Sequence, residues 1–363
     1  MRVVWWGAMR YCKFAIGLVA AVSLVVPCEG QKPPADLTSV PPVSNTYVPT
    51  KTPWGDPDFQ ATWTDDRIAQ AGIPLERPEA SGTRLMMTDA EFAKRLEDAK
   101  KSDRGYKETV DADGTAGLAG WVQSNQFARR TSLIVNPANG RLPLMTPAGA
   151  ALFKAGRNSW IEHQPIDWVS DLDSYDRCIS RGFPAAMLPW PNNNGMRLFQ
   201  SPGYVVMQLE VLGTRIIPIG KAAPWPSTVR GWMGQSLGHW EGNTLVIETS
   251  AIVAGDSATG EALKRAGSPV TGRGHGTVPM GPQAHTVERL TMTGPGTMVY
   301  QVMYSDPDVF TAPWTAEVQW TRDDKYQMYE FACHEGNEVR ELVTSSRAQR
   351  KKDAAKAVAV AGK

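Results

Sequence analysis

The feature that most constrains this fold is a succession of short segments in which apolar and polar residues alternate, separated by turns rich in Gly, Pro, Asn and Asp. Alternation with a period of two is typical of strands that bury one face. Ten such strands are predicted, over residues 132–135, 141–144, 204–212, 215–219, 229–237, 245–249, 285–292, 298–304, 314–321 and 326–333, and residues 59–63 are a further short candidate. No fixed-period repeat is evident, which argues against a propeller or a solenoid.

Strands in this number and order predict a mainly β protein. We expect about ten antiparallel strands in an up-and-down, lipocalin-like barrel over residues 58–345, with an interior of ligand size. Residues 158–200 are rich in Pro and Asn and carry no clear strand pattern. A loop of this length inside a domain is either functional or conceals a missed element. We predict that it folds as a lid over one mouth of the barrel.

A few short helices are expected beside the barrel, over residues 88–101, 147–154 and 338–351. The first has a capping box, in which Thr88 caps the helix and Glu91 returns a hydrogen bond. The second begins with a Thr-Pro pair, which is typical of a helix start.

The first thirty residues predict a signal peptide, because a basic stretch precedes an apolar run over residues 14–26 and cleavage is expected after Gly30. The mature protein is therefore expected in the periplasm or secreted, although an uncleaved anchor and a lipid-modified Cys28 are alternatives. Residues 31–57 are predicted to be an extended Pro-rich arm, and residues 346–363 a basic disordered tail. The formal net charge of +1 gives no indication of a nucleic-acid partner, and no other segment resembles a membrane helix.

Two cysteines, Cys178 and Cys333, remain once the signal peptide and Cys28 are removed. An even number of cysteines in an oxidising compartment favours a disulfide. The functional alternative is that Cys333 is a free nucleophile beside His334. Adjacent strand residues point to opposite faces, however, which argues against such a pair.

Strand parity places the ionisable residues of the last third. Glu288 and Arg289 are adjacent on a predicted strand, so they lie on opposite faces, whereas Glu330 shares a face with His334. A carboxylate that faces an apolar interior has a raised pKa unless an arginine pairs with it, and Arg215 and Arg289 are the available partners. The candidate catalytic residues are Glu288, Glu330, His334, Arg289 and Arg215. The alternative is that these residues form structural salt bridges or face water.

Two other kinds of chemistry receive little support. The potential metal ligands His285, Glu330, His334 and Glu335 lack any organising spacing, so no metal and no other cofactor is expected. Residues 234–238 match Gly-x-Ser-x-Gly, but a nucleophile elbow joins a strand to a helix, and here both sides are predicted as strand and turn. Ser236 is therefore interpreted as an ordinary strand residue.

Several segments resemble a family of exported bacterial proteins of uncharacterised function, found among proteobacteria and acidobacteria. The resemblance covers roughly residues 54–345 and is clearest in Trp240-Glu241-Gly242-Asn243-Thr244-Leu245-Val246 and in Ala332-Cys333-His334-Glu335-Gly336-Asn337. This chain departs from the family by a Gly-rich stretch over 272–281 and by Lys221-Ala222-Ala223 in place of a segment that resembles Arg-Pro-His. The family supplies no established reaction, so no catalytic role is carried over.

These observations favour a periplasmic or secreted barrel that binds a small hydrophobic or aromatic molecule. Large aromatic side chains can form a platform for such a ligand, although they also simply fill wide barrels. The residues we expect to contact the ligand are Trp232, Trp240, Tyr204 and Trp314. The main alternative is a hydrolase or lyase that uses the candidate carboxylates and His334. A structural envelope protein is a third possibility, and would have no cavity.

Overall fold

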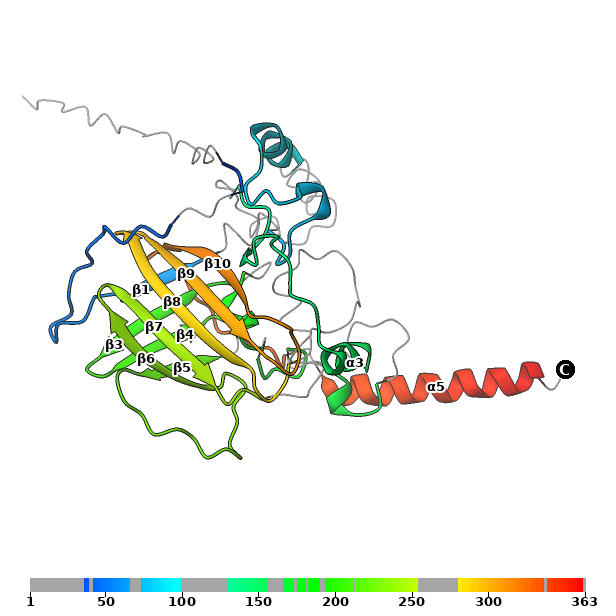
Figure 1. The fold of residues 1–363 in the computed structure, drawn as a ribbon. Coiled ribbons are helices and arrows are strands. Elements are labelled where there is room, and N and C mark those ends of the chain that lie inside the picture. Colours follow the sequence, from blue (N-terminus) through cyan, green and yellow to red (C-terminus); the bar gives the residue numbers. More distant parts are fainter. Residues whose placement is uncertain are drawn as a thin grey trace, which may run out of the picture. The chain divides into compact units, whose positions relative to one another are not determined.

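The computed structural model describes residues 36–38, 42–65, 73–98, 129–155, 166–172, 175–180, 182–189, 193–211, 213–253, 280–335 and 338–361. The predicted signal peptide lies outside these residues. Nine of the ten strands form a nearly closed antiparallel barrel (Figure 1): β1 (Ala61–Thr64), β3 (Met196–Ser201), β4 (Tyr204–Leu209), β5 (Thr214–Pro218), β6 (Gln235–Glu241), β7 (Thr244–Ser250), β8 (His285–Gly294), β9 (Thr297–Ser305) and β10 (Trp314–Arg322). The prediction of a mainly β, up-and-down barrel of about ten strands is confirmed.

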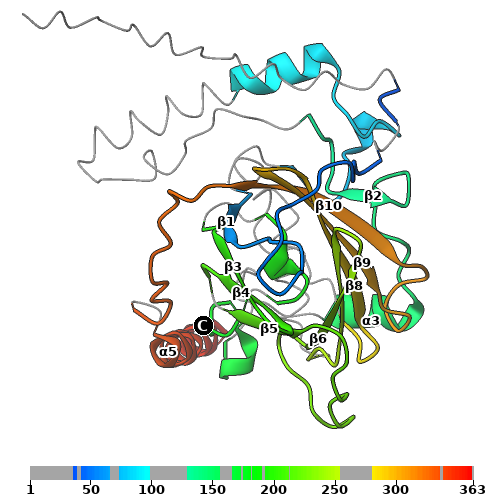
Figure 2. The same ribbon diagram turned by 90° about the vertical axis from the view of Figure 1, so that its left-hand side faces the viewer.

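The ring of strands closes at two places, at β1 and between β5 and β6 (Figure 2). β1 pairs with β3 on one side and with the end of β10 on the other, while a tenth strand, β2 (Ile134–Asn136), pairs with the start of β10. β5 and β6 meet at a seam. Because nine antiparallel strands are an odd number, the strands at the two ends of the path run parallel, and Ile219 and Gly238 form a parallel bridge there. β5 and β6 are therefore joined at this bridge and not by a continuous strand ladder.

Alternation along the strands creates the core. In β9 every second residue is buried, so that one face of the strand points into the barrel and carries Met298, Tyr300, Val302 and Tyr304. Short turns join neighbouring strands. The β6–β7 loop has only two residues, and Gly242 adopts a positive φ of 61° there, which glycine reaches without steric cost.

The predicted helix starts are confirmed where the structure describes them. Residues 89–98 are helical. Thr88 N donates to Glu91 Oε2 at 2.8 Å and Glu91 N donates to Thr88 Oγ1 at 3.2 Å, which is the predicted capping box. The helix α3 (Pro147–Ala155) is capped by Thr146, whose Oγ1 accepts from Gly149 N at 3.0 Å. The described residues also contain three short 3₁₀ helices, namely η1 (Glu79–Ser81), η3 (Val169–Asp171) and η4 (Ala185–Met187).

Several predicted boundaries need correction. Residues 326–333 contain no strand, and neither do residues 141–144. Both edges of β10 are already occupied, by β9 on one side and by β1 and β2 on the other, so a following strand has no partner left. Conversely, the stretch predicted as a lid over 158–200 contains most of β3, the element that the long loop concealed.

The C-terminal segment also differs from expectation. The helix α5 (Val339–Ala361) continues through most of the stretch that was predicted to be a disordered tail. Its residues are almost all exposed. Arg350 anchors it, because its Nη1 donates to Asp167 Oδ2 at 2.8 Å.

Candidate functional site

A buried ion pair crosses the interior of the barrel. Arg215 on β5 donates from Nη1 to Glu288 Oε1 at 2.8 Å and from Nη2 to Glu288 Oε2 at 2.5 Å. The two side chains are 1% and 0% exposed. Glu288 lies on β8, so the pair reaches across β6 and β7 and over the β5–β6 seam. Two parallel hydrogen bonds between a guanidinium and a carboxylate are a strong and directional arrangement.

Hydroxyl groups from three further strands surround the pair. Tyr300 on β9 donates its OH to Glu288 Oε1 at 2.8 Å. Arg215 Nη2 donates to Ser236 Oγ on β6 at 3.0 Å and to Thr249 Oγ1 on β7 at 3.2 Å. We call these five residues the lumenal cluster. Burying a charge is costly unless it is paired and hydrogen-bonded, and this cluster meets both conditions.

The surroundings of Arg215 and Tyr300 in the lumenal cluster raise the pKa of both groups, so both stay protonated at neutral pH. Burial disfavours the charged guanidinium, but the adjacent Glu288 outweighs burial, so the pKa of Arg215 is raised above its ordinary value. Burial, followed by the charge of Glu288, raises the pKa of Tyr300 well above its ordinary value. Both shifts move away from neutrality, whereas efficient general acid–base catalysis needs a pKa near the working pH.

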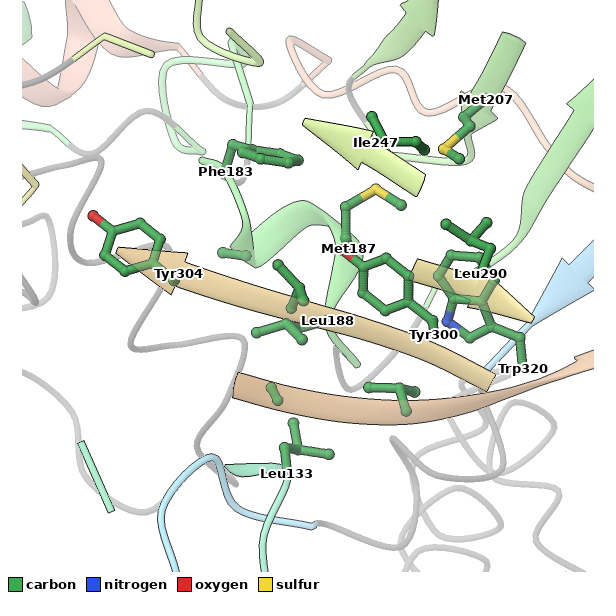
Figure 3. Close-up of a cluster of buried hydrophobic side chains, with 14 of the residues drawn as sticks. Leu133, Phe183, Met187, Leu188, Met207, Ile247, Leu290, Tyr300, Tyr304 and Trp320 are labelled. Atoms are coloured by element: carbon green, nitrogen blue, oxygen red, sulfur yellow. The ribbon is translucent and has the colours of Figure 1, made fainter. Parts of the chain in front are cut away.

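Residues 182–189, which we call the plug segment, fill the space beside the lumenal cluster. The Phe183 ring is fully buried and its centroid lies 4.6 Å from Arg215 Cζ, a cation–π contact. Met187 and Leu188 are buried in the same apolar core and lie among side chains of the barrel strands (Figure 3). Side chains of the plug segment thus form part of the apolar core of the barrel.

A small pocket remains between the plug segment and the barrel wall. Its volume is about 20 Å³, which is room for a water molecule. Asp65 and Glu210 are its buried carboxylates, and Glu210 accepts from Tyr326 OH at 2.7 Å and from Gly195 N at 2.9 Å. Met187 and Leu188 form part of the lining. Movement of the plug segment would therefore enlarge this pocket toward the interior.

The residues predicted as catalytic do not converge. Glu330 and His334 are exposed, in a stretch without regular secondary structure. Arg289 lies on the outer surface, where its Nη2 donates to Glu241 Oε2 at 2.7 Å. Of the five, only Arg215 and Glu288 are in contact, and they form a buried salt bridge, which is the structural alternative to a catalytic role.

The aromatic residues predicted to contact a ligand are also dispersed. Trp314 is fully buried, whereas Tyr204 is 47% exposed on β4. Trp240 packs edge-to-face against Phe59, with ring centroids 5.1 Å apart. Trp232 lies in the loop before β6. None of the four lines the small pocket, and their role in binding stays a prediction.

The predicted disulfide is present. Cys178 and Cys333 are bonded, with Cα atoms 5.5 Å apart. The bond ties the chain just before the plug segment to the stretch that follows β10. A disulfide is consistent with an oxidising, extracytoplasmic compartment.

Sequence reasoning missed Phe183, Tyr300 and Thr249. The last two were accessible in principle, because strand parity places Tyr300 and Thr249 on the same inner face as Glu288 once the register of β7, β8 and β9 is known. Phe183 carries no such signal, since it lies outside any strand. Ser236 lies on β6, as expected for an ordinary strand residue.

Comparisons with protein-family models, with curated proteins and with solved structures found no match. Within the described residues, no helix is both long and apolar enough to cross a membrane. The same residues contain no group of three or more His, Cys, Asp or Glu side chains placed to hold a metal ion.

Proposed function

We propose that this protein binds a small hydrophobic or aromatic molecule inside the barrel, in the space that the plug segment occupies. The observation that carries the proposal is the position of the Phe183 side chain. Its ring lies inside an antiparallel barrel, over the guanidinium of Arg215 at 4.6 Å, and is fully enclosed. This space therefore has the shape and electrostatics that suit an aromatic ring, and the chain's own phenyl group stands in for a ligand.

The backbone bonding of the plug segment supports its displacement. Ala186 N donates to Gly182 O, Met187 N to Pro184 O and Leu188 N to Ala185 O. These bonds are local, so the segment can leave the barrel without breaking any ladder between strands. The disulfide at Cys178 keeps it tethered nearby.

Location in the periplasm, or secretion, forms part of the proposal. It is supported by the disulfide and by the basic and apolar pattern of the first thirty residues.

The test is titration of the purified chain with N-phenyl-1-naphthylamine, a neutral aromatic probe whose emission rises in apolar surroundings. We expect saturable binding of one probe per chain. Phe183→Ala should bind at least about tenfold more tightly, because the probe no longer competes with the phenyl ring. Phe183→Leu serves the same purpose if the alanine variant is too unstable, since Phe→Ala in a core costs about 3–5 kcal/mol.

Phe199→Ala is the matched control, because Phe199 is 43% exposed on the outer face of β3. It should leave probe binding unchanged. Saturable binding by the Phe183 variants alone, with none by the unaltered chain, would mean that Phe183 is a permanent core residue and would sink the proposal.

A further inference from the structure

Another buried carboxylate, outside the lumenal cluster, lies in the turn after β9. Asp306 is 2% exposed. Its Oδ2 accepts hydrogen bonds from Gly281 N at 2.7 Å and from Tyr304 OH at 3.0 Å. Its other oxygen, Oδ1, is buried and has no hydrogen-bond partner among the described residues.

Asp308, two residues later, repeats this pattern. Its Oδ1 accepts from Gln283 Nε2 at 3.0 Å, whereas its Oδ2 is buried and lacks a partner in the described part of the chain. Buried polar atoms in native proteins almost always have a partner, so each exception calls for an explanation such as an ion or a water.

The two unpartnered oxygens converge. A Cβ atom placed on Gly281 would lie 2.8 Å from Asp306 Oδ1 and 3.0 Å from Asp308 Oδ2. Both oxygens therefore border one point beside Gly281. Any larger residue there would collide with both carboxylates, so glycine is required for this close approach.

The charge of this pair is not balanced by the groups around Asp306. Burial raises the pKa of Asp306, hydrogen bonds from Gly281 and Tyr304 lower it, the charge of Asp308 raises it again, and a backbone hydrogen bond from Asp308 lowers it slightly. None of these groups is cationic. The nearby Arg230 donates to the carbonyl oxygens of Ile252 and Pro282.

We infer that Asp306 and Asp308 bind a calcium ion through the two oxygens that converge beside Gly281. Hard carboxylate oxygens suit Ca²⁺, which tolerates irregular geometry and takes its remaining ligands from backbone carbonyls and water. With only two carboxylates the site is weak, in the range of about 10⁻⁴–10⁻³ M that is typical of extracellular modules. The ion would fasten the β9–β10 connection to the segment that enters β8.

The test compares the chelator-treated chain with the same chain in about 10 mM calcium chloride, a concentration chosen to exceed the expected dissociation constant. Calcium should raise Tm by about 2 °C. Terbium should show luminescence on excitation of aromatic residues, because Tyr304 donates directly to Asp306. Asp308→Asn should lose both effects, and so should Gly281→Ala, which places a methyl group against both oxygens.

Asp324→Asn is the control for non-specific binding, because Asp324 is an exposed carboxylate in the turn after β10, where it pairs with Arg322 on the surface. It should behave like the unaltered chain. A Tm that does not respond to calcium, or an equal response in Asp308→Asn, would overturn the inference. Asp306 and Asp308 would then share a proton or a buried water.

Discussion

Tyr300 and Tyr304 lie four residues apart on the inner face of β9, and each donates its hydroxyl to a buried carboxylate. The two carboxylates have opposite surroundings. Glu288 faces the guanidinium of Arg215, whereas Asp306 faces a second carboxylate. One barrel thus contains a charge that is neutralised by its own chain and a charge that is not. The comparison indicates that only the second is suited to take up a cation from solution.

The largest expected effect comes from breaking the neutralised pair. Glu288→Ala leaves Arg215 buried without a counter-charge, and we expect it to lower the free energy of unfolding by about 3–5 kcal/mol. Urea denaturation measures this. Arg289→Ala is the matched control on the adjacent residue, and should cost little or nothing, because its partner Glu241 is on the surface. If Glu288→Ala and Arg289→Ala lowered the free energy of unfolding by similar amounts, burial would not make the Arg215–Glu288 pair more important for stability than a surface pair.

A smaller effect should distinguish the two tyrosines. Tyr300→Phe and Tyr304→Phe each remove one hydrogen bond to a carboxylate, with an expected loss of about 1.5–3 kcal/mol. Tyr304→Phe should be the costlier in calcium-free buffer, since Asp306 has no cation to compensate. Added calcium should reduce the difference in the free energy of unfolding between the two variants, as measured by urea denaturation. An unchanged difference would argue against the contrast between Glu288 and Asp306.

The smallest effect is on pH dependence. The pKa of Asp306 is raised on folding, so its contribution to stability is fully present below the unfolded pKa and is lost as the pH rises through the folded pKa. Relative to Asp306→Asn, the unaltered chain should therefore gain stability as the pH falls from neutral toward the unfolded value. Urea denaturation of both chains, in chelator, checks this. If the free energy of unfolding changed with pH in the same way in both chains, Asp306 would not be the source of the pH dependence.

The sequence predicted the fold better than the site. Alternation alone located most of the barrel strands, because most of them alternate in burial along much of their length, as β9 does throughout. It failed for residues 326–333, whose pattern is strand-like but which follow a strand with no free edge. It also failed for β3, where Pro and Asn residues directly before Met196 disguised the start of the strand.

For the site, parity and charge balance predicted that Arg215 could pair with Glu288, and the structure confirms this. They could not predict that Phe183 would lie over Arg215, because that depends on how much volume the strands leave unfilled. The convergence of Asp306 and Asp308 was also beyond reach. It requires the position of Gly281, which comes before β8 and well before both aspartates in the chain.

The pairing of β1 with β10 also sets the order in which this protein can be completed. Trp63 and Arg322 are neighbours in the sheet, yet nearly all of the barrel is synthesised between them. Until β10 joins the sheet, β1 and β9 each present an open edge, and Cys333 lies further along the chain than β10. Such long-range pairing is slow to form. The barrel is therefore closed, and then locked by its disulfide, only when both ends of its sequence come together.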